Sequence, residues 1–441
     1  MSAVHTSDVV VVGNGIFGVT TAIALRERGA TVTLLDAGSV PNPDAASTDI
    51  SKLVRLDYGK DAGYVALMED ALVRWRQLNR EWGAPLFHET GIAVLTTAPL
   101  TSGTFEGDSF ELLRKRGHVL ERLEGRVSER FPAWKEGAFV DGYFNPQGGF
   151  AESGRVVEAL TARAERAGTK IVKGARVVPL AGDGPVSGVV TENGDRYSAE
   201  TTVVAAGAYT PILLPELADR IVPIAQNVFH FAPKSAAAFT APAFTPWAAD
   251  IATTGWYGFS HHASVVKVAN HGPGVTVDPA APRLADEAAL SEFRAFFERA
   301  LPGLAKAKVV FSRRCLYSDS FDGDFFIDRH PTRSGLAIAS GGSGHAFKFA
   351  PLLGELVADA LERRISKQGE RFRFRERGAT KTEAARASIA APTQITPSPA
   401  VPKKAASKKA PASKEPASTE PASTEPAAQA KPRRSPARSR S

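Results

Sequence analysis

The fold is decided by residues 9–36, VVVVGNGIFGVTTAIALRERGATVTLLD, whose pattern predicts a strand, a helix and a second strand in immediate succession. Val9 to Val12 is a continuous apolar run, which is typical of a strand buried on both faces. Ile16 to Arg28 has helical spacing, and Gly29 stands where a helix would end. Thr31 to Leu35 predicts the second strand. Such a unit is typical of the start of a parallel α/β sheet.

Three glycines and one acid in this unit predict a nucleotide-binding site. Gly13, Gly15 and Gly18 form G-x-G-x-x-G between strand and helix, and Asp36 ends the second strand. The first glycine permits a tight turn, the second lets the backbone approach a pyrophosphate, and the third allows the helix to touch the strand. The helix that begins at Ile16 offers N–H groups to the phosphates, and Asp36 would accept hydrogen bonds from an unphosphorylated ribose. The motif alone does not separate FAD from NAD.

Beyond this unit the chain continues to alternate helices and strands. Helices are expected where apolar residues recur at helical spacing, and strands where short apolar runs occur. The expected helices are 64–82, 155–167 and 351–361, and the expected strands are 170–172, 202–206 and 336–340. The body is therefore expected to have a mixed α/β fold.

Composition divides the chain into a neutral body and a basic tail. From about Gly378 the sequence consists mainly of Ala, Pro, Ser, Thr, Lys and Glu, which offer too little apolar surface to offset the entropy of ordering. Residues 401–441 carry a net charge of +7, which is the whole net charge of the chain. We therefore expect residues 378–441 to be disordered, and we expect no nucleic-acid partner apart from this tail.

The rare residue types exclude several classes of protein. A single cysteine excludes intramolecular disulfides and cysteine-rich zinc sites and favours a cytoplasmic location. No signal peptide and no apolar stretch of about 18 residues is found, so no membrane association is expected. The nine histidines are scattered, and the pair His261–His262 has no ligand partner at a useful spacing, so we expect no metal site.

Several later segments carry a family resemblance. They are STDISKLVRLDYG (47–59), VVAAGAY (203–209), WYGFSHHASVVKVANH (256–271), RRCLYSDSFDGDFFIDRHP (313–331) and SGGSGHAFKF (340–349). In order and spacing, over about residues 8–365, they resemble the D-amino-acid-oxidase superfamily, and within it the monomeric sarcosine oxidase and fructosyl-amino-acid oxidase branch.

The resemblance implies two interleaved domains. A Rossmann-like FAD-binding domain would comprise residues 1–82, 150–220 and 315–375. A substrate domain built on an antiparallel sheet would comprise residues 83–149 and 221–314. The active site would lie between them, over the face of the flavin.

The resemblance also implies that FAD is bound covalently, through a thioether between Cys315 and the 8-methyl carbon of the flavin. The only cysteine of the chain occupies this place. The alternative is a small buried hydrophobic side chain. The other residues implied to bind FAD are Gly13, Gly15, Ile16, Gly18, Asp36, Ser51, Lys52, Val177, Gly344, His345, Phe347 and Lys348.

Three cations are implied in the catalytic site. Arg55 and Lys348 match positions that bind a substrate carboxylate, as a planar fork and a point charge. The alternatives are a surface charge and a helix-start lysine. Lys267 matches a lysine near flavin N5 that activates oxygen, whose reduction creates negative charge. Alternation places it opposite Val266 and Val268, and the alternative is a lysine on the polar face of an edge strand.

The remaining site residues bear on the substrate. Tyr257 and Tyr317 match aromatic side chains that wall the pocket, with core packing as the alternative. His271 resembles the sarcosine oxidase pattern, because fructosyl oxidases tend to carry an acid there. Lys52, in contrast, matches the fructosyl oxidases, and Ala346 replaces a glycine and would narrow the space near the flavin. Sarcosine, other N-methyl amino acids, pipecolate, saccharopine and fructosyl amino acids all remain candidates.

The expected function is FAD-dependent oxidation of the secondary amine of an amino acid to an imine, with O2 reduced to H2O2, by a monomer. One alternative is an oxidase of fructosyl amino acids, pipecolate or saccharopine. A second is a flavin dehydrogenase that passes electrons to a carrier protein. A third is a non-catalytic nucleotide-binding interaction protein.

Overall fold

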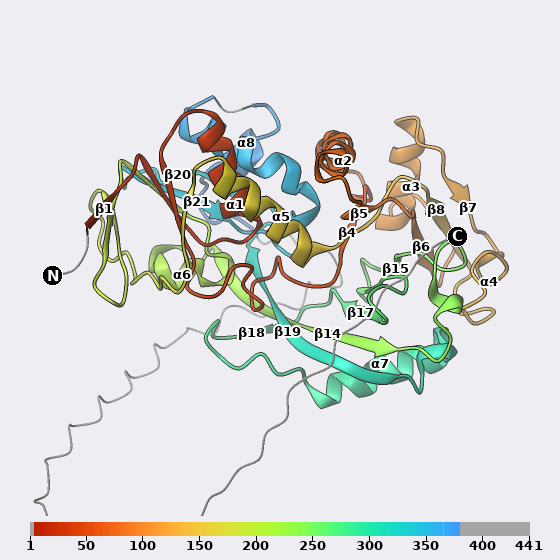
Figure 1. Cartoon of the computed structure of the whole chain (residues 1–441). Coiled ribbons are helices and arrows are strands. Elements are labelled where there is room, and N and C mark those ends of the chain that lie inside the picture. The colour runs from red at the N-terminus through yellow and green to blue at the C-terminus, as the bar shows by residue number, and fades with distance from the viewer. Residues whose placement is uncertain (1–3, 365, 380–441) are drawn as a thin grey trace, which may run out of the picture. The chain divides into compact units, whose positions relative to one another are not determined.

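The structure is a computed structural model that describes residues 4–364 and 366–379 (Figure 1). Apart from its first two residues, the segment predicted to be disordered, 378–441, lies outside the described residues. The predicted mixed α/β fold class is confirmed, and it rests on two large sheets.

The first large sheet has six strands that come from distant parts of the chain. Their spatial order is β10 (Lys170–Val172), β3 (Val32–Leu35), β2 (Val9–Val12), β13 (Thr201–Val204), β21 (Leu336–Ser340) and β20 (Phe326–Arg329). The first five strands are parallel and β20 is antiparallel. All four residues of β2 are buried, as its unbroken apolar run predicts for a strand covered on both faces.

Three helices cover one face of this sheet. Helix α1 (Ile16–Glu27) packs between α5 (Ser153–Arg166) and α8 (Ala350–Leu361), and the three lie together in Figure 1. The close crossing of α1 and α8 depends on a glycine, because a Cβ at Gly354 would lie 2.1 Å from the carbonyl oxygen of Thr20. A small sheet packs on the opposite face, formed by β1 (Val4–Thr6), β12 (Arg196–Ser198) and β11 (Gly188–Val190).

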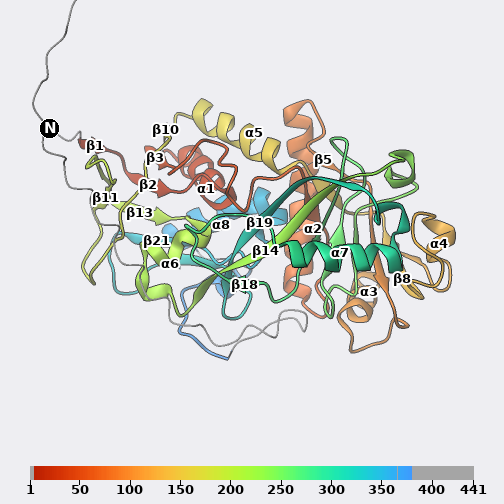
Figure 2. The same ribbon diagram turned by 90° about the horizontal axis from the view of Figure 1, so that it is seen from below.

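The second large sheet has nine strands. Its order is β18 (Val275–Thr276), β14 (Ile221–Ala232), β17 (Val266–Asn270), β16 (Trp256–Gly258), β15 (Trp247–Ala249), β6 (Ile92–Thr96), β8 (Asp141–Asn145) and β7 (Glu121–Arg122), and β19 (Lys308–Ser320) also pairs with β14. Figure 2 shows β14 and β19 running side by side. All pairs are antiparallel except β15 with β6.

Helix α7 (Glu287–Ala300) covers one face of the second sheet. Its Phe293, Phe296 and Phe297 belong to the same apolar core as Val266 and Val268 of β17. Since successive side chains of a strand point to opposite faces, Lys267 between these two valines points away from α7. This confirms the predicted alternation and places Lys267 on the face of the sheet opposite α7.

The remaining elements connect the two large sheets. A three-stranded sheet consists of β4 (Lys52–Val54), β9 (Gly149–Ala151) and β5 (Phe87–His88). The other helices are α2 (Ala62–Trp82), α3 (Phe105–Lys115), α4 (Val127–Arg130) and α6 (Thr210–Leu213). Helix α2 begins two residues before its predicted start, because the Asp61 side chain caps it by accepting from the Tyr64 N–H at 2.9 Å. Both large sheets lie in one compact unit, so the division into two domains stays a prediction.

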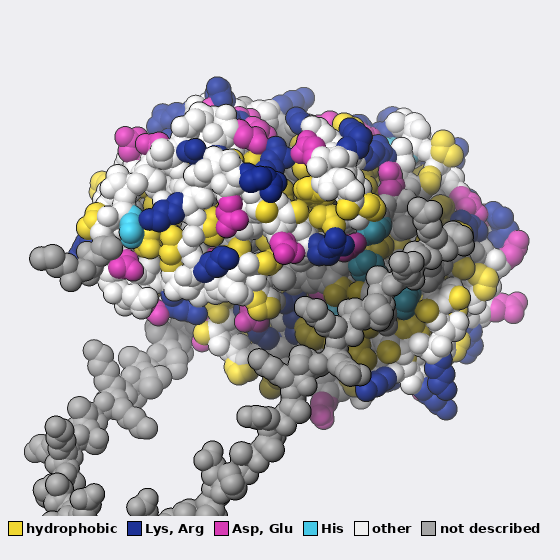
Figure 3. Space-filling model, viewed as in Figure 1, with side chains coloured by type: hydrophobic (Ala, Val, Ile, Leu, Met, Phe, Trp, Pro, Cys, Tyr) yellow, Lys and Arg dark blue, Asp and Glu magenta, His cyan; other side chains and the backbone are white. Residues whose placement is uncertain are grey.

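The surface and the helices bear on possible partners. Acidic and basic side chains are interspersed on the face shown in Figure 3, as expected of a body without net charge. Within residues 4–364 and 366–379, no helix combines the length and the apolar character that a bilayer crossing requires.

Candidate active site

Gly13 and Gly18 are required by close contacts at the start of α1. Gly13 has a φ of 106°, and a Cβ there would lie 2.5 Å from the carbonyl oxygen of Ala205. A Cβ at Gly18 would lie 1.8 Å from the carbonyl oxygen of Gly13. Any larger residue would therefore push α1 away from the sheet. Gly15 differs, because its nearest neighbour would be Ser47 Oγ at 3.4 Å and it lines a cavity.

This cavity has a volume of about 330 Å³ and begins at the glycine turn. Many of the residues predicted to bind the cofactor form its wall, namely Gly13, Gly15, Ile16, Asp36, Lys52, Val177, Gly344 and Phe347. The other predicted cofactor residues, Gly18, Ser51, Cys315, His345 and Lys348, do not line it. The glycine turn and strands of both large sheets thus line the same cavity.

Asp36 is held in a fixed position at the wall of this cavity. One carboxylate oxygen accepts from the Asn14 N–H at 2.8 Å, and the other accepts from the Gly38 N–H at 2.9 Å and the Asn42 amide at 3.2 Å. The side chain is buried, so these hydrogen bonds compensate its loss of water. Its predicted contact with a ribose stays a prediction.

Cys315 is buried in β19, next to the cavity. Its Sγ lies 3.9 Å from Nζ of Lys52, which lines the cavity. On the other side, Cys315 belongs to a small apolar cluster with Tyr317 and Ala269. The thiol therefore lies between an apolar cluster and a cation.

Lys267 is completely buried beside an acid. Strand β17 lies between β14 and β16, and the side chain of Lys267 is 1% exposed. Its Nζ lies 2.7 Å from Asp49 Oδ2, donates to the Ser51 carbonyl at 2.6 Å, and lies 4.7 Å from the centre of the Phe259 ring. The edge-strand alternative is therefore wrong, because β17 has a partner on each side.

The ionisation of this buried pair is shifted by two opposing effects. Burial lowers the pKa of Lys267 to about 8, although the charge of Asp49 opposes this shift. Burial alone would raise the pKa of Asp49, but the charges of Lys267 and neighbouring cations outweigh it and hold that pKa well below its ordinary value. His230 Nε2 and Arg313 Nη2 lie 3.3 and 3.6 Å from the Asp49 carboxylate. The lysine is therefore cationic below a pH of about 8.

Two further cations, Arg55 and Lys348, meet at Tyr58. Both are buried, so the alternative of a surface charge for Arg55 is wrong. The Arg55 guanidinium donates to the Asp57 carbonyl and lies 5.2 Å from the centre of the Tyr58 ring. Lys348 precedes α8, in a 3-10 turn (Ala346–Phe349), and its Nζ donates to the Tyr58 hydroxyl at 3.1 Å.

A chain of hydrogen bonds orients Lys348. Burial and the charge of Lys348 lower the pKa of His345 to about 3, so its ring is neutral. His345 Nε2 lies 2.9 Å from the Gly323 carbonyl and must donate to it, which leaves Nδ1 to accept from the Tyr58 hydroxyl at 3.1 Å. The Tyr58 oxygen in turn accepts from Lys348. The Lys348 ammonium, the Tyr58 hydroxyl, the His345 ring and the Gly323 carbonyl therefore form one chain in which each hydrogen bond has a fixed direction.

The predicted pocket aromatics lie together, although Tyr257 belongs to β16 and Tyr317 to β19, which do not pair with each other. The hydroxyl oxygens of Tyr257 and Tyr317 are 3.4 Å apart, and the rings of His271 and Tyr317 are 5.7 Å apart. Tyr317 also lines the cavity, and its ring packs so closely on Gly344 that a Cβ there would lie 2.4 Å from Tyr317 Cε2. Ala346 lines the cavity as well, so its methyl group takes up space at the wall.

Comparison with known proteins identifies the family. Residues 8–360 match a family model described as FAD dependent oxidoreductase. The chain belongs to this family of FAD-dependent oxidoreductases. It is 28% identical over 361 residues to a monomeric sarcosine oxidase of Bacillus sp. (strain B-0618), covering 80% of this chain and 91% of that relative. It is 29% identical over 360 residues to an N-methyl-L-tryptophan oxidase of Yersinia pestis (strain Pestoides F), covering 80% and 94%.

A solved structure extends the likeness to three dimensions. The fructosyl amine: oxygen oxidoreductase (Amadoriase I) of Aspergillus fumigatus superposes with a TM-score of 0.71 at 25% identity, covering 84% of this chain and 90% of that one. This FAD-dependent oxidoreductase therefore has relatives whose names include two of the substrate classes left open by the sequence, sarcosine and fructosyl amines.

The cavity of this FAD-dependent oxidoreductase fits its cofactor. Gly15 lines the cavity at the start of α1 and has no side chain of its own, so a pyrophosphate can approach its backbone. Asp36 presents a carboxylate suited to a ribose, and Lys52 and Phe347 line the same cavity. These residues would hold FAD along the wall that joins the two large sheets.

Sequence reasoning missed four residues of the site. Ser47, Asp49 and Tyr58 lie in the segment 47–59 that carried the family resemblance, so they were within reach. Ser47 Oγ accepts from the Ile16 N–H at 2.9 Å, Asp49 contacts Lys267, and Tyr58 contacts Lys348. The signal in the sequence was Asp49, an acid in a segment that also carries predicted cations. His230 carried none, because it meets Asp49 only through the pairing of β14 with β17.

No ligand partner of His262 was predicted at a useful sequence spacing, and two side chains from distant parts of the chain lie beside it. Its Nε2 lies 3.7 Å from the carboxylate of Glu152, which His88 also contacts. His88, Glu152 and His262 are far apart in the sequence, so no spacing pattern could reveal the group.

Proposed function

We propose that this FAD-dependent oxidoreductase oxidises the secondary amine of an amino acid of the sarcosine or N-methyl amino acid type. The carbon next to nitrogen loses a hydride, the product is an imine, and O2 is reduced to H2O2. The observation that carries the proposal is Lys267, a cation sequestered from water that pairs with Asp49 and donates to the carbonyl of Ser51, the residue before the cavity-lining Lys52. The names of the two sequence relatives support the substrate class.

The substrate carboxylate would be bound by Arg55 and Lys348. Both cations are buried, and both contact Tyr58, so one anion can reach the two of them together. His345 and Tyr58 act on Lys348 by fixing its direction. The amine would then face Tyr257 and Tyr317, whose aromatic rings tolerate an amine in either protonation state.

Lys267 would act on the oxygen side of the reaction. FAD supplies the redox chemistry by accepting the hydride and passing two electrons to oxygen. Negative charge develops on oxygen as it is reduced, and a preorganised cation in a water-excluded site stabilises that charge. Asp49 is a positioning residue here, because it raises the pKa of the lysine and fixes its direction. This arrangement favours an oxidase over a dehydrogenase with a carrier protein.

The alternative of a fructosyl amino acid substrate has two observations in its favour. Lys52 lines the cavity where the fructosyl oxidases also carry lysine, and the solved relative is named a fructosyl amine: oxygen oxidoreductase. His271, near Tyr317, favours the simpler secondary amine. Pipecolate and saccharopine stay open as further substrates.

Anaerobic bleaching of the flavin by a panel of amines tests the function. The panel holds sarcosine, N-methyl amino acids, pipecolate, saccharopine and fructosyl-lysine, and absorbance is followed at about 450 nm. We expect sarcosine or an N-methyl amino acid to bleach the flavin, and air to restore the colour rapidly. Slow recovery in air would point to the dehydrogenase. Bleaching by fructosyl-lysine alone would establish the alternative substrate, and no bleaching at all would contradict the proposal.

Asp49→Asn is expected to shift the pH dependence of flavin reoxidation. Lys267 has a pKa of about 8, so its charge is present below that pH and is lost above it. Reoxidation in the unchanged protein should therefore slow as the pH rises through about 8. Since the charge of Asp49 raises the pKa of Lys267, its removal should move this decline to lower pH.

The measurement is stopped-flow reoxidation of the reduced protein between about pH 6 and pH 10. Asp141→Asn is the matched control, because Asp141 is equally buried but pairs with Arg122. Its profile should match that of the unchanged protein. A profile that Asp49→Asn leaves in place would show that Asp49 does not control Lys267.

A further inference from the structure

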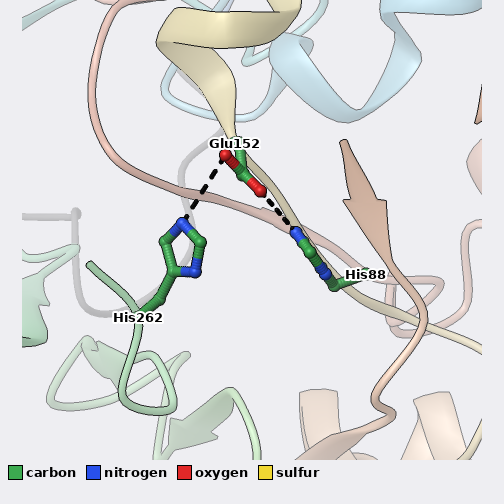
Figure 4. A group of neighbouring side chains, drawn as sticks. All are labelled: His88, Glu152 and His262. Carbon is green, nitrogen blue, oxygen red and sulfur yellow. Dashed lines mark hydrogen bonds and ion pairs between the residues drawn. The ribbon is translucent and has the colours of Figure 1, made fainter. Parts of the chain in front are cut away.

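His88, Glu152 and His262 converge on one point outside the active site (Figure 4). His88 Nε2 lies 2.7 Å from one Glu152 oxygen, and His262 Nε2 lies 3.7 Å from the other. One ligand atom from each of the three residues lies within 4.8 Å of the others. Within residues 4–364 and 366–379 this is the only such group of three histidine, cysteine or acidic side chains.

Each of the three side chains is carried by a hydrogen-bonded backbone. His88 ends β5 and pairs with Phe150 of β9. Glu152 is the N-cap residue of α5, and its N–H donates to the Leu86 carbonyl at 2.8 Å. His262 closes a tight turn, in which it exchanges two backbone hydrogen bonds with Val265 at 2.9 and 3.1 Å. The group is therefore held together by structure that does not depend on a ligand.

The distances suit a metal better than they suit hydrogen bonding throughout. Ligand atoms around a tetrahedral Zn²⁺ lie roughly 3.3 Å apart, given Zn–N and Zn–O bonds of about 2.0–2.2 Å. The two measured separations, 2.7 and 3.7 Å, lie on either side of that value. The second separation is too long for a hydrogen bond, so only His88 forms one with Glu152. His262 thus lies beside the Glu152 carboxylate without bonding to it, where a third metal ligand would lie.

Access and charge also bear on the site. The side chains of His88 and His262 are 25% and 27% exposed, so an ion can enter and keep a water ligand, while Glu152 is 8% exposed. Two features oppose a cation here, the positive end of α5 and Arg155, which contacts Glu152 at 2.7 Å. Arg155 is 61% exposed and can turn into solvent at little cost.

We propose that His88, Glu152 and His262 form a binding site for one divalent transition-metal ion of the Zn²⁺ class. Two imidazoles and one carboxylate are a common ligand set for such ions, and they leave a fourth position for water. The ion would join β5, the start of α5 and the turn at His262. The aromatic rings of Phe150 and Phe259 lie between this cluster and Lys267, so the site is separate from the active site.

Zinc binding by the full-length flavoprotein tests the proposal. The protein is stripped with a chelator, dialysed, and titrated with ZnCl₂ in competition with a chromophoric chelator. We expect one tight equivalent, and an increase in melting temperature on adding Zn²⁺. His262→Ala and Glu152→Gln should each weaken this binding by at least about tenfold and abolish the increase.

His261→Ala is the matched control, because His261 adjoins the cluster in sequence but is not part of it. It should bind Zn²⁺ as the unchanged protein does. The flavin spectrum and the metal-free melting temperature of each variant establish that it is folded. The tail should not compete, since residues 380–441 contain no histidine or cysteine. Absence of a tight equivalent, or equal binding by all variants, would overturn the proposal.

Discussion

Replacing Lys267 by methionine is expected to slow the reoxidation of reduced flavin by oxygen by about 100- to 1000-fold. The ammonium group is fully buried, so water cannot compensate for the positive charge that is lost when methionine replaces lysine. Methionine has a similar length and no charge, which keeps the volume of the site. Reduction of the flavin by the amine should change much less, because Arg55 and Lys348 bind the substrate carboxylate in our proposal. Stopped-flow mixing of reduced protein with oxygenated buffer separates the two half-reactions.

The Lys267→Met variant needs a control for Asp49, the acid that loses its partner. Lys267→Met leaves Asp49 buried without its nearest cation, although His230, Arg313 and Lys52 are still nearby, and a buried charge that loses its partner destabilises a protein. The double variant Asp49→Asn/Lys267→Met removes that charge and should regain stability without regaining reoxidation. If either variant reoxidises within about threefold of the unchanged rate, Lys267 does not activate oxygen. If only the reductive half-reaction fails, Lys267 acts on the substrate instead.

Cys315→Ser is expected to abolish the covalent attachment of the flavin. Acid precipitation of the unchanged protein should give a yellow pellet, and the variant should give a colourless pellet with the flavin in the supernatant. In forming the thioether, the thiol and the 8-methyl group each lose one hydrogen, a C–S bond forms, and O2 takes up both hydrogens as H2O2. Cys315 is the only cysteine, so no second thiol can replace it.

Two observations make Cys315 suited to this bond. Its Sγ lies beside the cavity wall, and Lys52 Nζ lies 3.9 Å away, where its charge can stabilise negative charge that develops on sulfur as the bond forms. Lys52→Met, which keeps the thiol, is the companion variant and should slow attachment without preventing it. A colourless pellet from the unchanged protein would show that FAD is held without a covalent bond. A yellow pellet from Cys315→Ser would show that another residue carries it.

The sequence alone was sufficient for the local elements and for the residues that need glycine. Apolar periodicity over residues 9–36 predicted β2, α1 and β3, and the structure places them within one residue of the expected bounds. Gly13 and Gly18 were predicted from the turn and the helix contact, and each would clash with a neighbouring carbonyl if it carried a Cβ. These features depend on residues close together in the chain, so the pattern of the chain reveals them.

The sequence predicted individual residues of the site, but it did not predict which side chains would surround them. Family motifs indicated Lys267, Arg55 and Lys348, but their alternatives of edge strand and surface charge were decided only by burial. Burial depends on which strands flank β17 and on what covers segment 47–59. Neither can be calculated from the residues themselves.

The partners of these residues were decided by the tertiary structure. Asp49, His230 and Lys267 come from three distant segments and meet because β14 pairs with β17 in one register and segment 47–59 lies against that sheet. A shift of one residue in that register would send Lys267 into the apolar core. The periods of helices and strands depend on residues close together in the chain, so these elements could be predicted from the sequence alone. Contacts between distant side chains follow from strand pairing and packing, and these are settled only when the whole chain folds.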